Sequence, residues 1–189
     1  MTQENNAGNT ADREVVISRL LNAPRELVFK AWTDQQHISQ WWGPTGFTTT
    51  TSEMNVAPGG VWRFVMHGPD GTDFPNKIIF SEVVAPQLLV YAHDDDGKKA
   101  IPNFTVRVTF EEHDGKTLLT MRSLFKTAAE RDHVVKEYGA IEGGKQTLER
   151  LEERLSKMPV GKNLVITKVV DAPKELVFKA WTEAERLAK

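Results

Sequence analysis

The most regular hydrophobic pattern in the chain is a strict alternation that predicts β-strands. Residues 61–67 place Trp62, Phe64 and Met66 on one face, with Arg63 and Val65 on the other. A period of two residues is typical of a strand that buries one of its faces. Alternation or a β-branched composition predicts further strands at 14–21, 47–55, 76–84, 87–93, 104–110 and 117–125.

Short turn signals separate these predicted strands. Asp-Gly dipeptides occur at 70–71, 96–97 and 114–115, and a Pro-Gly-Gly turn occupies 58–60. Asp-Gly is a preferred two-residue connection between antiparallel strands. We therefore expect a meander of antiparallel hairpins rather than parallel strands joined by helices.

Helical spacing replaces the alternation directly after the first strand. Pro24 suits the first position of a helix, whose apolar face would consist of Leu27, Val28, Ala31 and Trp32. Thr33 with Gln36 has the spacing of a capping box, which predicts a second short helix that extends to Trp41.

A longer helical pattern follows the last predicted strand. Thr127 with Glu130 forms a second capping-box pattern. The apolar positions that follow at helical spacing are Val134, Tyr138, Ile141, Leu148, Leu151 and Leu155. The pattern predicts one amphipathic helix of about 30 residues, which is long for a globular domain. Its charged positions near the end, from 149 to 154, are expected to form a solvated face.

The order of these elements predicts the fold class. One strand, two short helices, five or six antiparallel strands and one long helix make an α+β protein. A curved antiparallel sheet folded around a long C-terminal helix buries the apolar faces of both.

A repeated segment predicts the domain organisation. Residues 165–183 match residues 16–34 at twelve of nineteen positions, and the other seven are conservative replacements. The offset of 149 residues is the length of a domain rather than of a short structural repeat. We expect a disordered tail at 1–12, a complete domain at 13–158, and at 159–189 the truncated start of a second copy. This last segment would be mobile or would dock on another molecule, so that self-association through 159–189 is one expectation.

Composition narrows the class of protein. The chain is 40% hydrophobic and 26% charged, with a formal net charge of -2, which is typical of a globular protein. It has no cysteine, so disulfides and cysteine-bound zinc are excluded. No basic run indicates nucleic-acid binding. No apolar run is long enough for a signal peptide or a membrane span, and we expect a cytoplasmic location without a membrane partner.

Five segments in this order resemble one known family. They read APRELVFKAWTD, QWWGP, GGVWRFVMHGPDG, FPNKIIFSEVV and EYGAIEGGKQTLERLEERL. They are similar to the family named after the C-terminal domain of the activator of Hsp90 ATPase, within the START-like, Bet v 1-like superfamily (SRPBCC). The resemblance covers residues 14–157 and implies a helix-grip fold with an apolar cavity between the sheet and the long helix. Nothing in the chain resembles the separate N-terminal Hsp90-binding domain of the eukaryotic activator.

The hydrophobic pattern indicates which side chains would line the cavity that the resemblance implies. The candidate ligand-binding residues are those assigned to the inner faces of the strands and of the helix: Trp62, Phe64, Met66, Phe104, Val106, Val108, Met121, Phe125, Tyr138, Ile141 and Gly144. The alternative is that they pack against one another as core. Gly143 and Gly144 lie on the apolar face of the long helix and lack side chains, which would leave volume beneath the helix. The alternative is that they permit a close helix–sheet contact or a kink.

Other residues offer weaker signals. Trp41 and Trp42 at the end of a helix are expected to split, with one in the core and one half exposed. His67 and Asp73 flank an Asp-Gly turn and would meet near one rim, where a His–Asp pair can act as a general base. His93 and the aspartates at 94–96 are expected to be solvated or to form a turn, and we assign no catalytic residue, metal site or cofactor.

Three functions follow from these observations. The first is a non-enzymatic module that binds a small apolar molecule. The second, from the family resemblance alone, is a co-chaperone-like regulator of an Hsp90-type ATPase. The third is a cyclase or hydrolase on the same fold, which a His–acid pair facing the cavity would favour.

Overall fold

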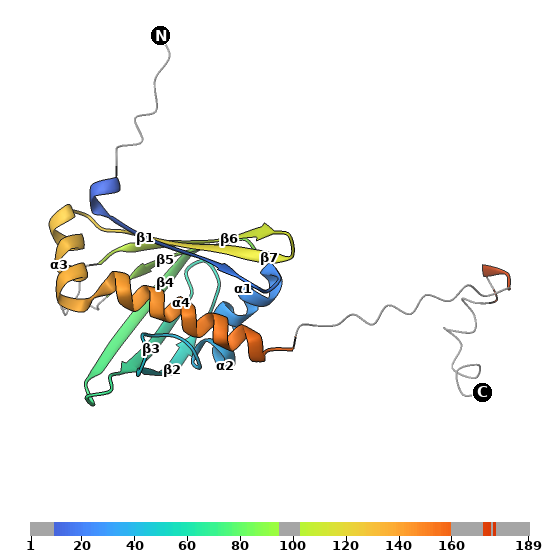
Figure 1. The fold of residues 1–189 in the computed structure, drawn as a ribbon, viewed down its shortest axis with the longest axis horizontal. Coiled ribbons are helices and arrows are strands. Elements are labelled where there is room, and N and C mark those ends of the chain that lie inside the picture. Colours follow the sequence, from blue (N-terminus) through green and yellow to red (C-terminus); the bar gives the residue numbers. More distant parts are fainter. Residues whose placement is uncertain (1–9, 95–102, 160–171, 175, 177–189) are drawn as a thin grey trace, which may run out of the picture.

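The computed structural model, which describes residues 10–94, 103–159, 172–174 and 176, contains one curved antiparallel sheet (Figure 1). Its seven strands lie in the order β1-β7-β6-β5-β4-β3-β2. The strands are β1 Glu14–Leu21, β2 Thr48–Met54, β3 Val61–His67, β4 Asp73–Val84, β5 Leu88–His93, β6 Thr105–His113 and β7 Lys116–Leu124. The helices are η1 Ala11–Arg13, α1 Arg25–Thr33, α2 Gln35–Ile38, α3 Ala128–Tyr138 and α4 Ala140–Lys157.

The predicted antiparallel meander is confirmed. Strands β2 to β7 pair in sequence order, and β1 then pairs with β7 at the end of the sheet. Asp114 and Gly115 both have positive φ angles, of 50° and 76°, between the paired residues His113 and Lys116. Positive φ at both central residues is what a two-residue hairpin turn needs in order to match the twist of the strands. The Asp-Gly pair at 96–97 lies outside the described residues.

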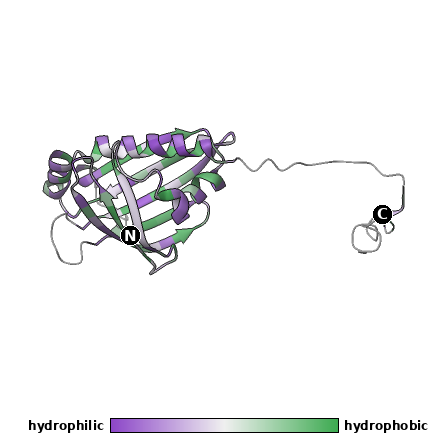
Figure 2. Ribbon diagram, turned by 90° about the horizontal axis from the view of Figure 1, so that it is seen from below, coloured by the Kyte–Doolittle hydropathy of each residue, from purple (hydrophilic) through white to green (hydrophobic). Residues whose placement is uncertain are grey.

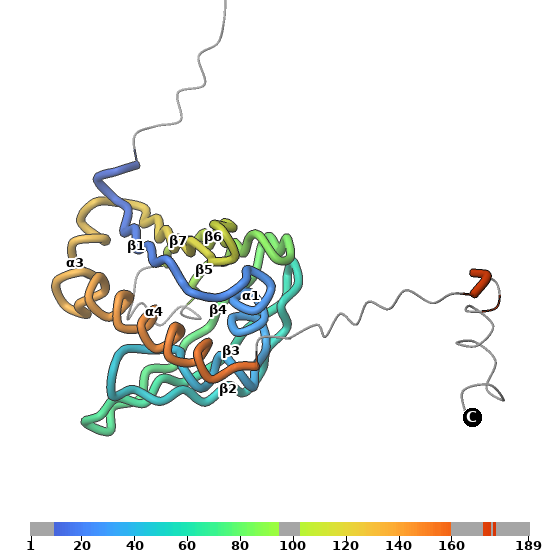
Figure 3. The backbone as a smooth tube through the Cα atoms, turned by 45° about the vertical axis from the view of Figure 1, so that its right-hand side comes forward, coloured from blue at the N-terminus to red at the C-terminus, as the bar shows by residue number. Residues whose placement is uncertain are grey.

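The prediction of one 30-residue helix is wrong, because Gly139 interrupts it. Gly139 has a φ of 59°, in the left-handed region that glycine adopts at little cost. The chain therefore forms α3, which begins with the predicted capping box of Thr127 and Glu130, and then α4 in a new direction. Figures 1 and 3 show α4 running between the β1 edge and the β2–β3 edge of the curved sheet.

The second short helix also differs from its prediction. Asp34, not Thr33, is the N-cap of α2, and its side chain accepts a hydrogen bond from the backbone N–H of Gln36. The hydroxyl of Thr33 instead donates to the carbonyl of Phe29 within α1. Helix α2 ends at Ile38, before Trp41.

Tryptophans fill the end of the concave face that α1 and α2 cover. Trp32, Trp41 and Trp42 are in mutual edge-to-face contact, and Trp42 also contacts Trp62 at 5.0 Å between ring centroids. The expectation that Trp41 and Trp42 split is wrong, since both are buried. The indole N–H of Trp41 donates to the carbonyl of Ala31, which satisfies its polar group inside the core.

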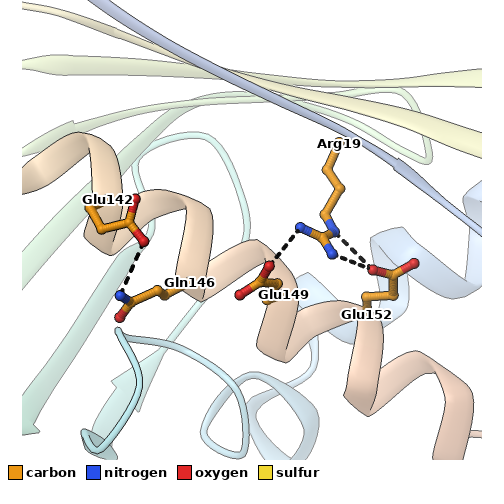
Figure 4. A network of polar contacts seen from close by, with 5 residues as sticks. All are labelled: Arg19, Glu142, Gln146, Glu149 and Glu152. Atoms are coloured by element: carbon orange, nitrogen blue, oxygen red, sulfur yellow. Dashed lines mark hydrogen bonds and ion pairs between the residues drawn. The ribbon is translucent and has the colours of Figure 1, made fainter.

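Helix α4 carries apolar residues toward the sheet and charged residues away from it, and Figure 2 shows both kinds along its ribbon. Leu148, Leu151 and Leu155 are buried. The prediction that the charged positions only form a solvated face is incomplete, because two of them also pair with the sheet. Arg19 on β1 forms ion pairs with Glu152 at 2.6 Å and with Glu149 at 3.5 Å (Figure 4).

The predicted segments at the two ends of the chain are described only in part. Most of the expected tail 1–12 lies outside the described residues, but Ala11 and Asp12 belong to η1, and Arg131 donates to the Asp12 carbonyl at 2.6 Å. The expectation for 159–189 falls almost entirely outside the described residues. Within the part of the chain that the structure describes, no helix is both long and apolar enough to cross a membrane.

Candidate functional site

The register of the sheet brings inward-facing side chains from four strands into rows. Tyr91 pairs with Val106, Val106 with Ser123, and Ser123 with Val15, so this row runs across β5, β6, β7 and β1. Directly paired residues of antiparallel strands project from the same face of the sheet. These side chains therefore lie side by side on the concave face.

A cavity of about 210 Å³ lies between this face and helices α3 and α4. The sheet contributes most of the wall, the helices contribute the opposite side, and Trp42, Gly43 and Pro44 add part of the rim. Tyr138 lines the cavity but leaves 45% of its surface exposed, so the cavity reaches the surface beside the end of α3. The wall is mainly apolar, as in most small-molecule sites.

The structure brings seven of the eleven predicted site residues into this wall. They are Met66, Phe104, Val106, Met121, Phe125, Tyr138 and Gly144. Trp62, Phe64 and Val108 are instead fully buried in the core and do not line the cavity. Ile141 does not line it either and is 39% exposed, because the break at Gly139 changes the helical phase in which its position was counted.

Five polar residues of the wall were missed by the sequence analysis as ligand-binding candidates. They are Asn76, Tyr91, His93, Ser123 and Thr147. His93 is predicted from the sequence to be a solvated strand-end residue, and its place in the wall contradicts that prediction. The signal was present in the alternation of β5, since Leu89 and Tyr91 are buried and His93 has the same parity.

The His93 imidazole is part of an aromatic row. Its ring stacks on Phe104 with centroids 4.4 Å apart, and Phe104 stacks on Phe125 at 4.8 Å. Among the described residues, no group hydrogen-bonds either ring nitrogen. Burial lowers the pKa of His93 to about 4, so the ring is neutral at physiological pH, with one nitrogen that donates and one that accepts. Burial also raises the pKa of the Tyr91 hydroxyl, which stays protonated.

Gly144 does not leave empty volume in the way that the sequence predicts. A Cβ atom built on Gly144 would lie well inside contact distance of Ile17 Cδ1 and 3.6 Å from Met121 Cε. The side chain of Ile17 on β1 thus occupies the space, and the glycine permits the close approach of α4 to the sheet. Gly143 also lines the cavity, at its rim, where a Cβ would be 3.3 Å from Pro44 Cγ.

Helix α4 also holds the rim of the cavity. The guanidinium of Arg150 donates to the carbonyls of Gly43 and Pro44, at 2.8 and 2.9 Å. The side-chain oxygen of Gln146 accepts a hydrogen bond from the backbone N–H of Thr45. Burial lowers the pKa of Arg150, but the group remains charged and its hydrogen bonds to the carbonyls are charge-assisted.

The predicted meeting of His67 and Asp73 is observed, but away from the cavity. Nδ1 of His67 is 2.6 Å from a carboxylate oxygen of Asp73, and Nε2 is 3.0 Å from the hydroxyl of Thr50. The side chains of His67 and Asp73 are 37% and 61% exposed, and neither lines the cavity. Both side chains are therefore partly open to solvent rather than enclosed. In the described ranges, no group of three or more His, Asp or Glu side chains is placed to hold a metal ion.

Comparison with known proteins identifies similar domains. The model of the family described as activator of Hsp90 ATPase homolog 1-like protein matches residues 22–156. A crystal structure of a Nitrosomonas europaea protein is 26% identical with a TM-score of 0.70, over 78% of this chain and 96% of the other. A Mycobacterium smegmatis protein is 24% identical with a TM-score of 0.71, over 80% and 95%. An Aeromonas hydrophila protein of the same family name is 24% identical with a TM-score of 0.61, over 76% and 92%. No curated protein matches the chain.

Proposed function

The chain belongs to the family of activator of Hsp90 ATPase homolog 1-like proteins, and we propose that it is a non-enzymatic module that binds a small apolar molecule in the cavity beneath α3 and α4. The observation that carries this proposal is the cavity itself. A volume of about 210 Å³ exceeds the ~150 Å³ of an engineered apolar cavity that binds benzene. Its wall of aromatic and methionine side chains suits an apolar occupant.

The shape of the wall supports an adaptable site. Met66 and Met121 contribute flexible thioether side chains, and such side chains adjust to ligands of different outline. Phe104, directly before β6, and Phe125, directly after β7, contribute flat surfaces. An apolar molecule that enters the cavity would contact both kinds of surface and would be removed from water.

A fluorescent probe with a blocking variant tests this proposal. N-phenyl-1-naphthylamine, an uncharged dye that brightens in apolar surroundings, is expected to bind the intact chain at one site. Ser123→Leu adds apolar volume in the middle of the cavity wall and should weaken binding by at least about tenfold, which is about 1.4 kcal/mol.

Ser18→Leu is the matched control, because it makes the same substitution on the opposite, exposed face of the sheet. It should leave binding unchanged. Equal binding by wild type, Ser123→Leu and Ser18→Leu would place the dye outside the cavity and contradict the proposal. Native mass spectrometry of the purified protein adds an independent readout, a mass adduct that Ser123→Leu reduces.

A second candidate function, regulation of an Hsp90-type ATPase, follows from the family name alone. Its test is the ATPase rate of such a chaperone with and without this chain. The enzyme hypothesis has less support, because a hydrolase or cyclase needs an acid–base pair beside its substrate. The pair formed by His67 and Asp73 lies at an exposed strand end instead.

A further inference from the structure

We propose that the occupant of the cavity is an uncharged molecule with an apolar body and one hydrogen-bonding head, and that Asn76, Tyr91 and His93 hold this head at the β4–β5 end. The inference rests on the ligand-binding function proposed above and adds the chemical class of the ligand.

The absence of charge in the wall supports an uncharged ligand. Among the described residues that line the cavity, none is Asp, Glu, Lys or Arg. Burying an ion without a partner of opposite charge costs many kcal/mol, far more than burying a neutral polar group. Arg150 does not relieve this cost, because its guanidinium is directed to the carbonyls of Gly43 and Pro44. A carboxylate, a phosphate or an ammonium group would therefore enter without compensation.

Three polar side chains of the wall lie on the neighbouring strands β4 and β5, while Ser123 lies on β7 and Thr147 on α4. His93 pairs with Ile78, and Asn76 lies two residues before Ile78 on the same face of β4. Residues in this diagonal relation have Cα atoms about 7–8 Å apart and are within reach of one polar group between them. The ring centroid of Tyr91 is 6.1 Å from that of His93. The three side chains thus surround one end of the cavity.

These polar groups also have unused hydrogen-bonding capacity. The Asn76 amide nitrogen donates to the Phe74 carbonyl, which leaves its side-chain oxygen to accept. Within the described ranges, the His93 ring and the Tyr91 hydroxyl have no hydrogen-bond partner. These groups face the cavity without a protein partner for the atoms named, so a hydroxyl, carbonyl or amide on the ligand can hydrogen-bond to them. The neutral imidazole can donate to such a group or accept from it.

The opposite end of the cavity is apolar. Ile17 on β1 and Met121 on β7 pair across the sheet. Strand β7 lies two strands away from β5, and each step across a sheet is about 4.8 Å. The head and the far end of the body would therefore be separated by about 10 Å, which fits a rigid two-ring molecule.

A matched pair of dyes tests the exclusion of charge. N-phenyl-1-naphthylamine and 1-anilinonaphthalene-8-sulfonate share one ring skeleton and differ by the sulfonate. The uncharged dye should bind at least about tenfold more tightly, and Ser123→Leu should weaken its binding. If the sulfonate binds equally or more tightly in the Ser123-sensitive site, the inference is wrong while the proposed function stands. If neither dye binds, the proposed function itself fails.

A second pair of probes tests the head group. In wild type, 2-naphthol should bind at least about tenfold more tightly than 2-methylnaphthalene, measured by NMR or calorimetric titration. His93→Phe keeps the ring that stacks on Phe104 but removes both nitrogens, and should reduce this ratio to about twofold. His113→Phe, on an exposed hairpin, should leave the ratio unchanged.

Tyr91→Phe removes only a hydroxyl and provides a second test if His93→Phe does not fold. It should also reduce the preference for 2-naphthol. A preference that stays at the wild-type value in the folded variants would contradict the assignment of the head to the β4–β5 end.

Discussion

The concave face of one sheet is covered in two different ways, and the comparison explains where a cavity forms. At one end, α1 and the segment after α2 place Trp32, Trp41 and Trp42 against the sheet. We call this region the tryptophan end. At the other, α3 and the start of α4 cover the sheet with smaller side chains, such as those of Val134 and Ala140, and about 210 Å³ remains. We call this region the cavity end.

The difference shows that the segments covering the sheet, rather than the sheet itself, determine where the concave face is fully packed and where a cavity remains. The sheet contributes large side chains at both ends, such as Phe64 at the tryptophan end and Phe104 at the cavity end. Only at the tryptophan end do the covering segments add side chains of comparable size. The tightly packed core and the cavity proposed for binding thus lie in different halves of the domain.

Truncations at the two ends should have the most unequal effects. Trp32→Ala removes a fully buried indole from the tryptophan end and should lower the free energy of unfolding by about 3–5 kcal/mol. Met121→Ala, at the cavity end, should cost no more than about 2 kcal/mol, because part of its side chain already faces empty space. Urea denaturation measures both, and equal losses would contradict the comparison.

Acid should destabilise the protein through His93 at the cavity end. The folded pKa of about 4 lies below the ordinary value of 6.5, so the unfolded chain takes up a proton that the folded chain excludes. The contribution of the neutral His93 ring to the free energy of unfolding is fully present above pH 6.5. It is lost as the pH falls toward 4, by up to about 3 kcal/mol.

His93→Phe should remove this part of the pH dependence. Asp94, which pairs with Lys77, and the other carboxylates titrate in both proteins, so the difference between the two unfolding curves isolates His93. His113→Phe, a substitution at an exposed position, should keep the wild-type curve. Identical curves for wild type and His93→Phe would mean that the cavity end is hydrated enough to accept the charge.

Substitutions at two neighbouring glycines of α4 test how tightly the cavity end is packed. Gly144→Ala pushes the end of the Ile17 side chain toward the cavity, where there is room. The gain in helix propensity offsets part of the strain, so the change in unfolding free energy should stay within about 1 kcal/mol. Dye binding should weaken because volume is lost. Gly143→Ala, whose Cβ would meet Pro44 at the rim of the cavity, should weaken dye binding less than Gly144→Ala does. A loss of more than about 3 kcal/mol for Gly144→Ala would mean that the cavity end is as tightly packed as the other.

The smallest expected effect concerns the ion pairs between β1 and the middle of α4. Arg19→Met breaks the pairs with Glu149 and Glu152, whose side chains are half exposed (Figure 4). Partly solvated pairs contribute about 0–1 kcal/mol, and salt screens them. The difference between wild type and Arg19→Met should therefore shrink at high salt. A salt-independent loss would assign Arg19 a packing role instead.

The sequence by itself determined the strands, several turns and the order of the elements, but not the division of the last helical pattern into α3 and α4. Alternation in 61–67 set the strand and the face that Trp62 and Phe64 bury, and Thr127 with Glu130 set the start of α3. The Asp-Gly turn at 114–115 set a hairpin. These features depend on backbone preferences and side-chain periodicity within a few residues, so a local pattern is sufficient to predict them.

Only the tertiary structure decided which side chains surround empty space. His93 joins Phe104 and Phe125 through strand pairing, and Trp62 packs among tryptophans rather than in the cavity wall. Gly139 changes the phase of the helix, so Ile141 turns outward while Gly144 meets Ile17. Register, helix direction and the fit of covering helices depend on residues far apart in the chain. A cavity is the volume that these distant parts leave unfilled, so a local sequence pattern cannot establish its presence.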